Sequence, residues 1–231
     1  MKRFYKQAAV APAEGGYAVL LDGKPIHTPA KTTLVVKSRK LAEAMAEEWQ
    51  TEDEEINLTD LHLTRLAGTV IDLIEPRRAQ IIAEIAKYAA TDLLCYRAES
   101  PPELAARQHA AWQTHLDWAG SRYAPLTVTQ GIAPLEQAPE ALESYRAAVA
   151  AHDSMILAAL YVATSALGSL VLALALIEGR IDAEQAFTTS QLDESFQIER
   201  WGEDDEAARR RAGLKDDIDL AARFAEFHRA G

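Results

Sequence analysis

A stretch without any charged residue runs from Met155 to Ile177, and Asp153 and Glu178 bound it. As a helix it would be roughly 35 Å long at about 1.5 Å per residue, which is enough to cross a bilayer. The flanks show no Lys/Arg asymmetry, and no second stretch of this kind exists. We therefore interpret it as the central buried helix of a soluble helical domain, which needs neighbours on every side.

Small residues within this stretch recur at helical spacing. Ser165, Ser169 and Ala173 follow one another at steps of four, so they would form a stripe on which another helix can pack closely. We expect Gly168 and Ser169 to be structural anchors inside one continuous helix, and Gly168→Leu to destabilise the protein by overpacking.

The first 37 residues read as short strands. Phe4–Val10, Tyr17–Leu21, Pro25–Thr28 and Thr33–Val36 are the β-prone runs. Asp22-Gly23 separates two of them and is a strong hairpin signal, because both residues tolerate positive φ. These features predict a small β-containing N-terminal domain.

Helical patterns follow. Ser38 is a predicted N-cap, and an apolar face leads from Leu41 to Trp49, which we expect to be a structural anchor. We place the N-terminal domain, with this one helix, at residues 1–60, and a multihelical domain at residues 61–231. The predicted fold class is α+β, mainly α, with the helices packed around the central apolar helix.

Charge and cysteine content limit the partners and the compartment. The net charge of −11 argues against a nucleic-acid or anionic membrane surface. Cys95 is the single cysteine, so no intramolecular disulfide can form, and we expect it to be a small buried residue. The start of the chain resembles neither a secretory signal nor an organelle presequence. We expect a cytoplasmic protein, without membrane insertion, that acts as a monomer.

Residues 182–201 form a predicted helix, with Asp182 as N-cap and Gln185 completing a capping box. Leu192 and Phe196 should face the core, while Glu194, Gln197 and Trp201 share another face. The sequence contains none of the common phosphate-binding, zinc-protease, hydrolase or calcium-loop motifs. His109 and His115 are six residues apart and do not form a metal pair on one helical face. We therefore expect no metal site and no cofactor.

Several stretches taken together resemble the Atp12 chaperones, assembly factors for the F1 sector of ATP synthase. They are RFYK (Arg3–Lys6), LDGKPIHTP (Leu21–Pro29), EEW (Glu47–Trp49), TDLLCYRA (Thr91–Ala98), the Gln108…Trp112 pair, the Gly168-Ser169 step and LDESFQIERWGEDDEA (Leu192–Ala207). The family often has two glutamates after the leucine of the last motif, where this chain has Asp193-Glu194.

The resemblance implies a protein without enzymatic activity that binds the F1 α subunit and prevents its aggregation before assembly with β. It places the chain in the bacterial cytoplasm, whereas eukaryotic members act in the mitochondrial matrix. Asp193, Glu194, Gln197 and Trp201 are then candidate partner-binding residues. Two alternatives remain open: a small metal-dependent hydrolase using the carboxylates of residues 193–206, and a helical scaffold for another partner.

Overall fold

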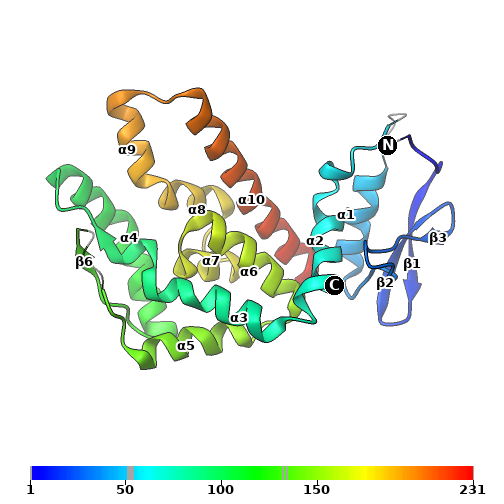
Figure 1. Cartoon of the computed structure of the whole chain (residues 1–231), viewed down its shortest axis with the longest axis horizontal. Coiled ribbons are helices and arrows are strands. Elements are labelled where there is room, and N and C mark those ends of the chain that lie inside the picture. Colours follow the sequence, from blue (N-terminus) through cyan, green and yellow to red (C-terminus); the bar gives the residue numbers. More distant parts are fainter. Residues whose placement is uncertain (1, 51–54, 132, 134, 231) are drawn as a thin grey trace. The chain divides into compact units, whose positions relative to one another are not determined.

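The structure, a computed structural model, describes residues 2–50, 55–131, 133 and 135–230. The chain forms two compact units (Figure 1). Unit 1 comprises Met1–Arg78, Ser154–Ala158 and Arg223–Gly231, and unit 2 comprises Ala79–Asp153 and Ala159–Ala222. Helices predominate beside a small sheet, so the predicted α+β, mainly α class is confirmed. The predicted division after residue 60 stays a prediction.

Unit 1 contains a small antiparallel sheet of β1 (Ala8–Ala13), β2 (Gly16–Leu21), β3 (Lys24–Pro25) and β4 (Val35–Val36). Strand β2 is central, because β1 pairs with one edge and both β3 and β4 pair with it as well. The turn between β2 and β3 has positive φ at both Asp22 (48°) and Gly23 (82°). A two-residue hairpin turn of type I′ requires positive φ at both central residues. The Asp-Gly signal therefore correctly predicted the turn.

One helix of unit 1, α1 (Arg39–Trp49), covers this sheet through contacts with β1 and β2. The hydroxyl of its N-cap, Ser38, accepts a hydrogen bond from the Leu41 amide at 3.2 Å. The predicted apolar face is confirmed, since all its members are buried: Leu41, Ala42, Met45, Ala46 and Trp49.

A second helical segment of unit 1 follows, built from the 3-10 turn η1 (Leu58–Asp60), α2 (His62–Thr69) and the π-helical turn η2 (Val70–Ile74). The carboxylate of Glu48 accepts hydrogen bonds from the amides of Leu63 (2.7 Å) and Thr64 (2.9 Å). These amides belong to the first turn of α2 and have no partner within the helix, so Glu48 caps α2 from α1. One helical segment therefore runs from His62 to Ile74, and its last turn is π-helical.

The remaining elements lie wholly or mostly in unit 2. In chain order they are α3 (Arg78–Ala86), η3 (Lys87–Thr91), η4 (Leu93–Cys95), β5 (Tyr96–Arg97), α4 (Pro102–Arg122), β6 (Thr129–Gln130), α5 (Pro139–Ala150), α6 (Ser154–Leu167), α7 (Leu170–Ile177), α8 (Ala183–Ser190), α9 (Leu192–Trp201) and α10 (Asp205–Arg229). Every residue of α7 is buried, and α4, α8 and η3 all contact α7. The core of unit 2 therefore surrounds α7. Among the described residues, no helix has the length and apolarity needed to span a membrane.

The central apolar stretch differs from the prediction, because it is two helices and not one. Helix α6 ends at Leu167, Gly168 has a φ of 63°, and the extended residue Ser169 becomes the N-cap of α7. The predicted small-residue stripe is split at this break, and its first member, Ser165, is exposed. Gly168 and Ser169 are thus a turn and a cap.

A buried aspartate stabilises this break. Asp92 is fully buried, and its Oδ1 accepts hydrogen bonds from the Ser169 hydroxyl (2.8 Å) and the Leu94 amide (3.1 Å). Its Oδ2 accepts one from the Val171 amide at 3.0 Å, and the Leu93 amide donates to the Gly168 carbonyl at 3.1 Å. The segment before β5 therefore satisfies the free backbone groups at the start of α7.

Gly168→Leu is still expected to destabilise the protein, but for another reason than overpacking. A Cβ at Gly168 would meet nothing within 4 Å, so overpacking is not the reason. The left-handed backbone is the reason, and it costs an L-residue about 1–2 kcal/mol. Gly168→Ala and Gly168→Leu should therefore lower the free energy of unfolding by similar amounts, measured by urea denaturation.

Gly213 in α10 provides the matched control. It also has nothing within 4 Å of an added Cβ, but its φ is not positive. Gly213→Ala should leave stability unchanged or raise it by up to about 1 kcal/mol, the helix preference of alanine over glycine. A much larger loss for Gly168→Leu than for Gly168→Ala would contradict the backbone explanation.

Candidate partner-binding surface

The predicted helix over residues 182–201 is two helices in the structure, a second correction. The capping box of Asp182 and Gln185 is present at the start of α8, as predicted. Gln191, which has φ −95° and ψ 20°, interrupts the helix before α9 begins at Leu192. The interruption gives α9 its own direction, and all four candidate partner-binding residues lie on it.

Asp193 points into unit 2. Gln108, which is 1% exposed, donates from Nε2 to Asp193 Oδ1 at 2.8 Å and accepts from the Ala98 amide at 2.7 Å. Burial raises the pKa of Asp193, while the Gln108 hydrogen bond and the charge of Arg97 act in the opposite direction. The side chain thus joins the first turn of α9 to α4, which is a structural role.

Arg97 extends this polar cluster. Its guanidinium donates to the Gln108 carbonyl at 2.6 Å and lies 5.1 Å from the ring centroid of Trp112. The Trp112 indole donates in turn to the Thr189 carbonyl at 2.9 Å, close to the end of α8. Since buried polar groups of this kind are costly unless paired, the cluster fixes α4, α8 and α9 in one arrangement.

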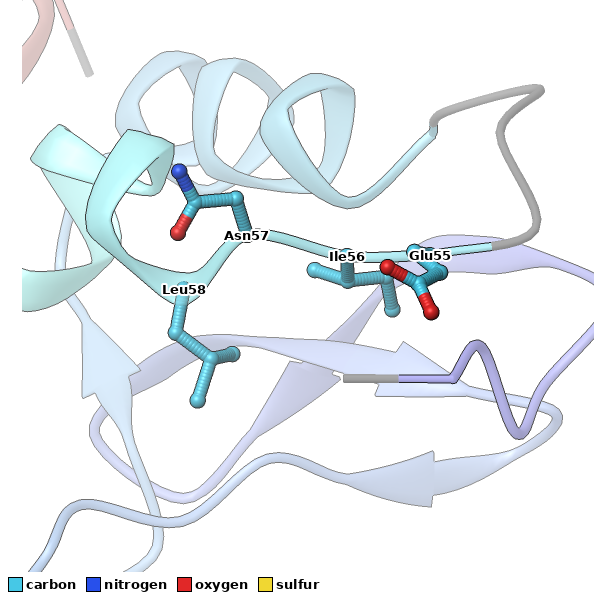
Figure 2. A pocket seen from close by; sticks show the side chains of 4 residues that line it. All are labelled: Glu55, Ile56, Asn57 and Leu58. Atoms are coloured by element: carbon cyan, nitrogen blue, oxygen red, sulfur yellow. The ribbon is translucent and has the colours of Figure 1, made fainter.

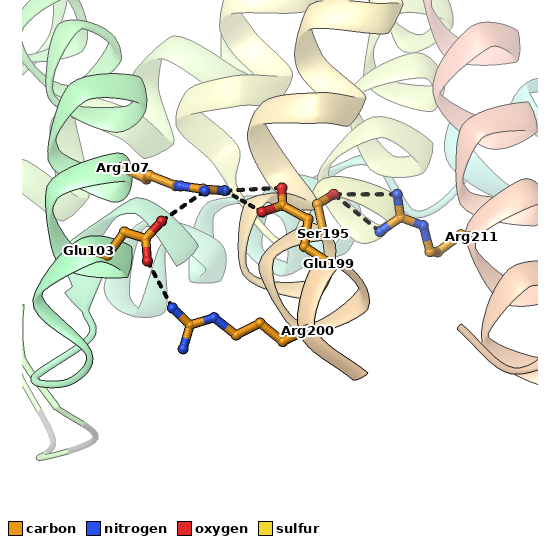
Figure 3. Close-up of polar contacts among 6 residues, drawn as sticks. All are labelled: Glu103, Arg107, Ser195, Glu199, Arg200 and Arg211. Atoms are coloured by element: carbon orange, nitrogen blue, oxygen red, sulfur yellow. Dashed lines mark hydrogen bonds and ion pairs between the residues drawn. The ribbon is translucent and has the colours of Figure 1, made fainter. Parts of the chain in front are cut away.

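An ion-pair network lies over the exposed side of α9 and α4 (Figure 3). Glu103 pairs with Arg107 at 3.0 Å and with Arg200 at 2.8 Å, and Arg107 also pairs with Glu199 at 2.8 Å. The guanidiniums of Arg200 and Arg107 lie 4.1 Å and 5.2 Å from the ring centroid of Phe196, which is buried. Each exposed pair contributes little alone, but together with the cation–π contacts they cover the ring and hold α9 against α4.

On its other side, α9 is linked to α10. Arg211 of α10 donates to the Ser195 hydroxyl at 3.4 Å (Figure 3). It also pairs with Glu203 at 3.3 Å. A cavity of about 150 Å³ lies between α8, α9 and α10. Its lining residues are Ser190, Gln191, Asp193, Glu194, Ala207, Arg210, Arg211 and Leu214. Glu194 is therefore half-buried at a cavity edge, facing arginines of α10.

Gln197 and Trp201 are exposed, and Trp201 has 76% of its surface accessible. Gly202 ends the helix, and four exposed acidic residues follow: Glu203, Asp204, Asp205 and Glu206. We call Glu194, Gln197 and Trp201 the α9 face. It presents a large aromatic ring beside negative charge on a helix that is fixed at both flanks.

The remaining predicted residues lie elsewhere. Trp49 is 8% exposed in unit 1, and Gly168 and Ser169 form the helix break described above. Sequence reasoning missed the Glu103–Arg107 pair, although its spacing of four residues on one helix was a usable signal. It also missed Arg97 and Arg200, for which no local signal exists.

The part of the chain that the structure describes contains no cluster of three or more His, Cys, Asp or Glu side chains placed to bind a metal ion. Cys95 is buried as expected, and burial raises the pKa of its thiol to about 12. An exposed tryptophan on a helix that its neighbours hold in place is typical of a surface that binds another protein.

Comparison with known proteins agrees with this class. The profile of the family described as ATP12 chaperone protein matches residues 2–120. The crystal structure of Atp12 from Paracoccus denitrificans is 40% identical in sequence, covers 98% of both chains and has a TM-score of 0.95. The mitochondrial protein atp12 of Schizosaccharomyces pombe is 25% identical over an alignment of 214 residues, and the match covers 87% of this chain and 74% of that protein. The chain belongs to the ATP12 chaperone family.

Proposed function

We propose that this chaperone binds the α subunit of the F1 sector of ATP synthase and keeps it from aggregating before it joins β. An isolated subunit exposes apolar surface that its neighbour would cover, and such surface drives association. A protein that binds this surface lowers the free concentration of the aggregating species by mass action. The proposal includes action as a monomer in the bacterial cytoplasm, without a cofactor and without catalysis.

The exposure of Trp201 supports the proposal more than any other observation. A tryptophan with 76% of its surface exposed is unusual, because burying a large aromatic ring is favourable. Tryptophan is also enriched among the residues that dominate binding energy at interfaces. The neighbouring acidic run, Glu203 to Glu206, would steer encounter with a basic client surface.

Trp201→Ala should weaken binding of the α subunit by about 2 kcal/mol or more, roughly 30-fold, as expected for an aromatic hot spot. Its free energy of unfolding should change by less than about 0.5 kcal/mol, because the ring is exposed. Glu194→Lys should also weaken binding, since it reverses a charge of the α9 face and adds a third positive group near Arg210 and Arg211. The measurements are pull-down of F1 α subunit and suppression of its aggregation.

Tyr161→Ala serves as the control. Tyr161 is an aromatic residue of α6 with 41% exposure, and it does not belong to the α9 face. It should leave binding unchanged. If Trp201→Ala and Glu194→Lys are folded, equally stable and fully able to hold the α subunit in solution, the α9 face is not the binding surface.

A further inference from the structure

An apolar groove in unit 1 has no part in the function described above. Its volume is about 650 Å³, within the range of roughly 300–1,000 Å³ that is typical of ligand sites. It is bordered by residues of the β-containing segment, of η1, and of α2 and η2. The residues that matter for its shape are Leu34, Leu58, Arg65, Gly68, Asp72 and Leu73.

The floor of the groove is deepened by a residue without a side chain. A Cβ added to Gly68 of α2 would lie 3.9 Å from Thr28 Cγ2 and 4.0 Å from Leu34 Cδ1. These are ordinary contact distances, and the φ of Gly68 is not positive. Larger residues could therefore occupy this position, and they would reduce the space in the groove.

Two leucines at the edges of the groove are exposed, Leu58 by 46% and Leu73 by 47%. Leu73 lies on the π-helical turn η2, a rare element that is frequent at functional sites. Asp72 on the same turn accepts hydrogen bonds from the Thr28 hydroxyl (2.8 Å) and the Ala30 amide (3.0 Å). The chain segment that contains Thr28 and Ala30 is thus held to η2 by hydrogen bonds. The groove is therefore already formed without an occupant.

A second cavity, of about 470 Å³, adjoins the groove at Leu58. It is lined by Glu55, Ile56, Asn57 and Leu58, and Figure 2 shows the Leu58 side chain pointing away from that of Asn57. Both hollows are lined in part by Leu58. Exposed leucines at the border of an apolar hollow are typical of a surface that another protein covers.

Arg65 supplies a positive charge at the groove. Its exposed guanidinium donates to the Thr59 carbonyl at 3.0 Å, and within the described residues no carboxylate forms an ion pair with it. The carboxylate of Asp72, which also lines the groove, accepts hydrogen bonds from Thr28 and Ala30. The rim therefore offers a positive group that is complementary to a carboxylate of an occupant.

We propose that this groove docks a segment of a partner protein that carries bulky aliphatic side chains and an adjacent carboxylate. The aliphatic side chains would lie between Leu58 and Leu73 over Gly68, and the carboxylate would pair with Arg65. This is a second docking surface, and it does not depend on which protein is the client or on the α9 face.

The test uses a fluorescent amphipathic peptide of about twelve residues, with leucine at every third or fourth position and one flanking glutamate. Fluorescence anisotropy with the full-length protein should show saturable binding. Leu58→Ser and Leu73→Ser, which alter exposed side chains, should each weaken binding by about tenfold, and Gly68→Phe should abolish it. Gly68→Ala should have a much smaller effect, and Trp201→Ala none.

A charge exchange tests the role of Arg65. Arg65→Glu should weaken binding of the glutamate peptide and favour a matched peptide with lysine in that place, whereas Arg77→Glu, at another exposed arginine, should change neither. Equal binding of a peptide with the leucines scattered would overturn the proposal. So would equal binding to Leu58→Ser and Leu73→Ser, binding of a fatty acid but of no peptide, or a protein dimer that Gly68→Phe dissociates.

Discussion

Asp92→Ala should lower the free energy of unfolding by at least about 3 kcal/mol. The substitution leaves three buried donors without their acceptor: the Ser169 hydroxyl and the amides of Leu94 and Val171. Each buried unsatisfied group costs about 1–3 kcal/mol, and the Ser169 hydroxyl, which caps α7, also loses the acceptor that orients it. Urea denaturation followed by circular dichroism measures the change.

Asp92 should also make stability depend on pH. Burial raises its pKa to about 6, although the hydrogen bonds it accepts act in the opposite direction. The folded state therefore binds this proton more tightly than the unfolded state, where the pKa is about 3.9. The stabilising contribution of protonated Asp92 is complete below pH 4 and is lost as the pH rises through 6. The total is about 3 kcal/mol at 1.36 kcal/mol per pKa unit.

Asp92→Asn isolates this contribution, because it has nearly the same shape and does not titrate. As the pH falls from about 7 to about 5, the wild type should gain stability relative to Asp92→Asn, while other carboxylates affect both proteins alike. The opposite trend, a relative loss on acidification, would mean that the donors around Asp92 stabilise its ionised form more than burial disfavours it. A constant difference would show that its pKa is the same in both states.

Features that depend on neighbours in the sequence could be predicted. The Asp22-Gly23 turn, the Ser38 cap, the buried face of α1 and the capping box at Asp182 are all present. Each is decided within about one turn of chain, by φ preferences, capping hydrogen bonds or the helical repeat. The fold class follows from the sum of such local signals.

The breaks at Gly168 and Gln191 could not be predicted in this way. An apolar stretch shows no periodicity that distinguishes one helix from two. The sequence therefore indicated that Gly168 and Ser169 lie inside one continuous helix. What decides the break is Asp92, which is 77 residues away from Ser169 in the sequence. The same holds on α9, where Gln108 binds Asp193 across 85 residues and Arg107 binds Glu199 across 92.

These long-range contacts also divide the four candidate residues by role. Asp193 is held inside unit 2 by Gln108, and Glu194 borders a cavity, while Gln197 and Trp201 are exposed. The helical spacing correctly separated Glu194, Gln197 and Trp201 from the core residue Phe196. It could not show that Asp193 is partly buried, because that depends on α4.

Trp49→Ala should lower the free energy of unfolding by about 3–5 kcal/mol, the usual cost of removing a buried large aromatic side chain. Trp49 is 8% exposed, and its indole donates to the Thr64 hydroxyl at 3.3 Å. Its ring meets that of Tyr5 edge to face at 5.9 Å, and the Tyr5 hydroxyl donates to its carbonyl. The substitution therefore leaves a cavity where α1, α2 and the N-terminal segment meet in unit 1.

Trp49→Phe and Trp201→Ala separate structure from binding. Trp49→Phe keeps most of the buried ring and loses the hydrogen bond to Thr64. It should therefore lower the free energy of unfolding by only about 1–2 kcal/mol relative to the wild type. Trp201→Ala is the same chemical change as Trp49→Ala at an exposed ring, and it should lower binding and not stability. Since Trp49 also borders the groove of unit 1, a Trp49→Ala protein as stable as the wild type that no longer binds its partner would show that Trp49 is a binding residue and not a structural anchor.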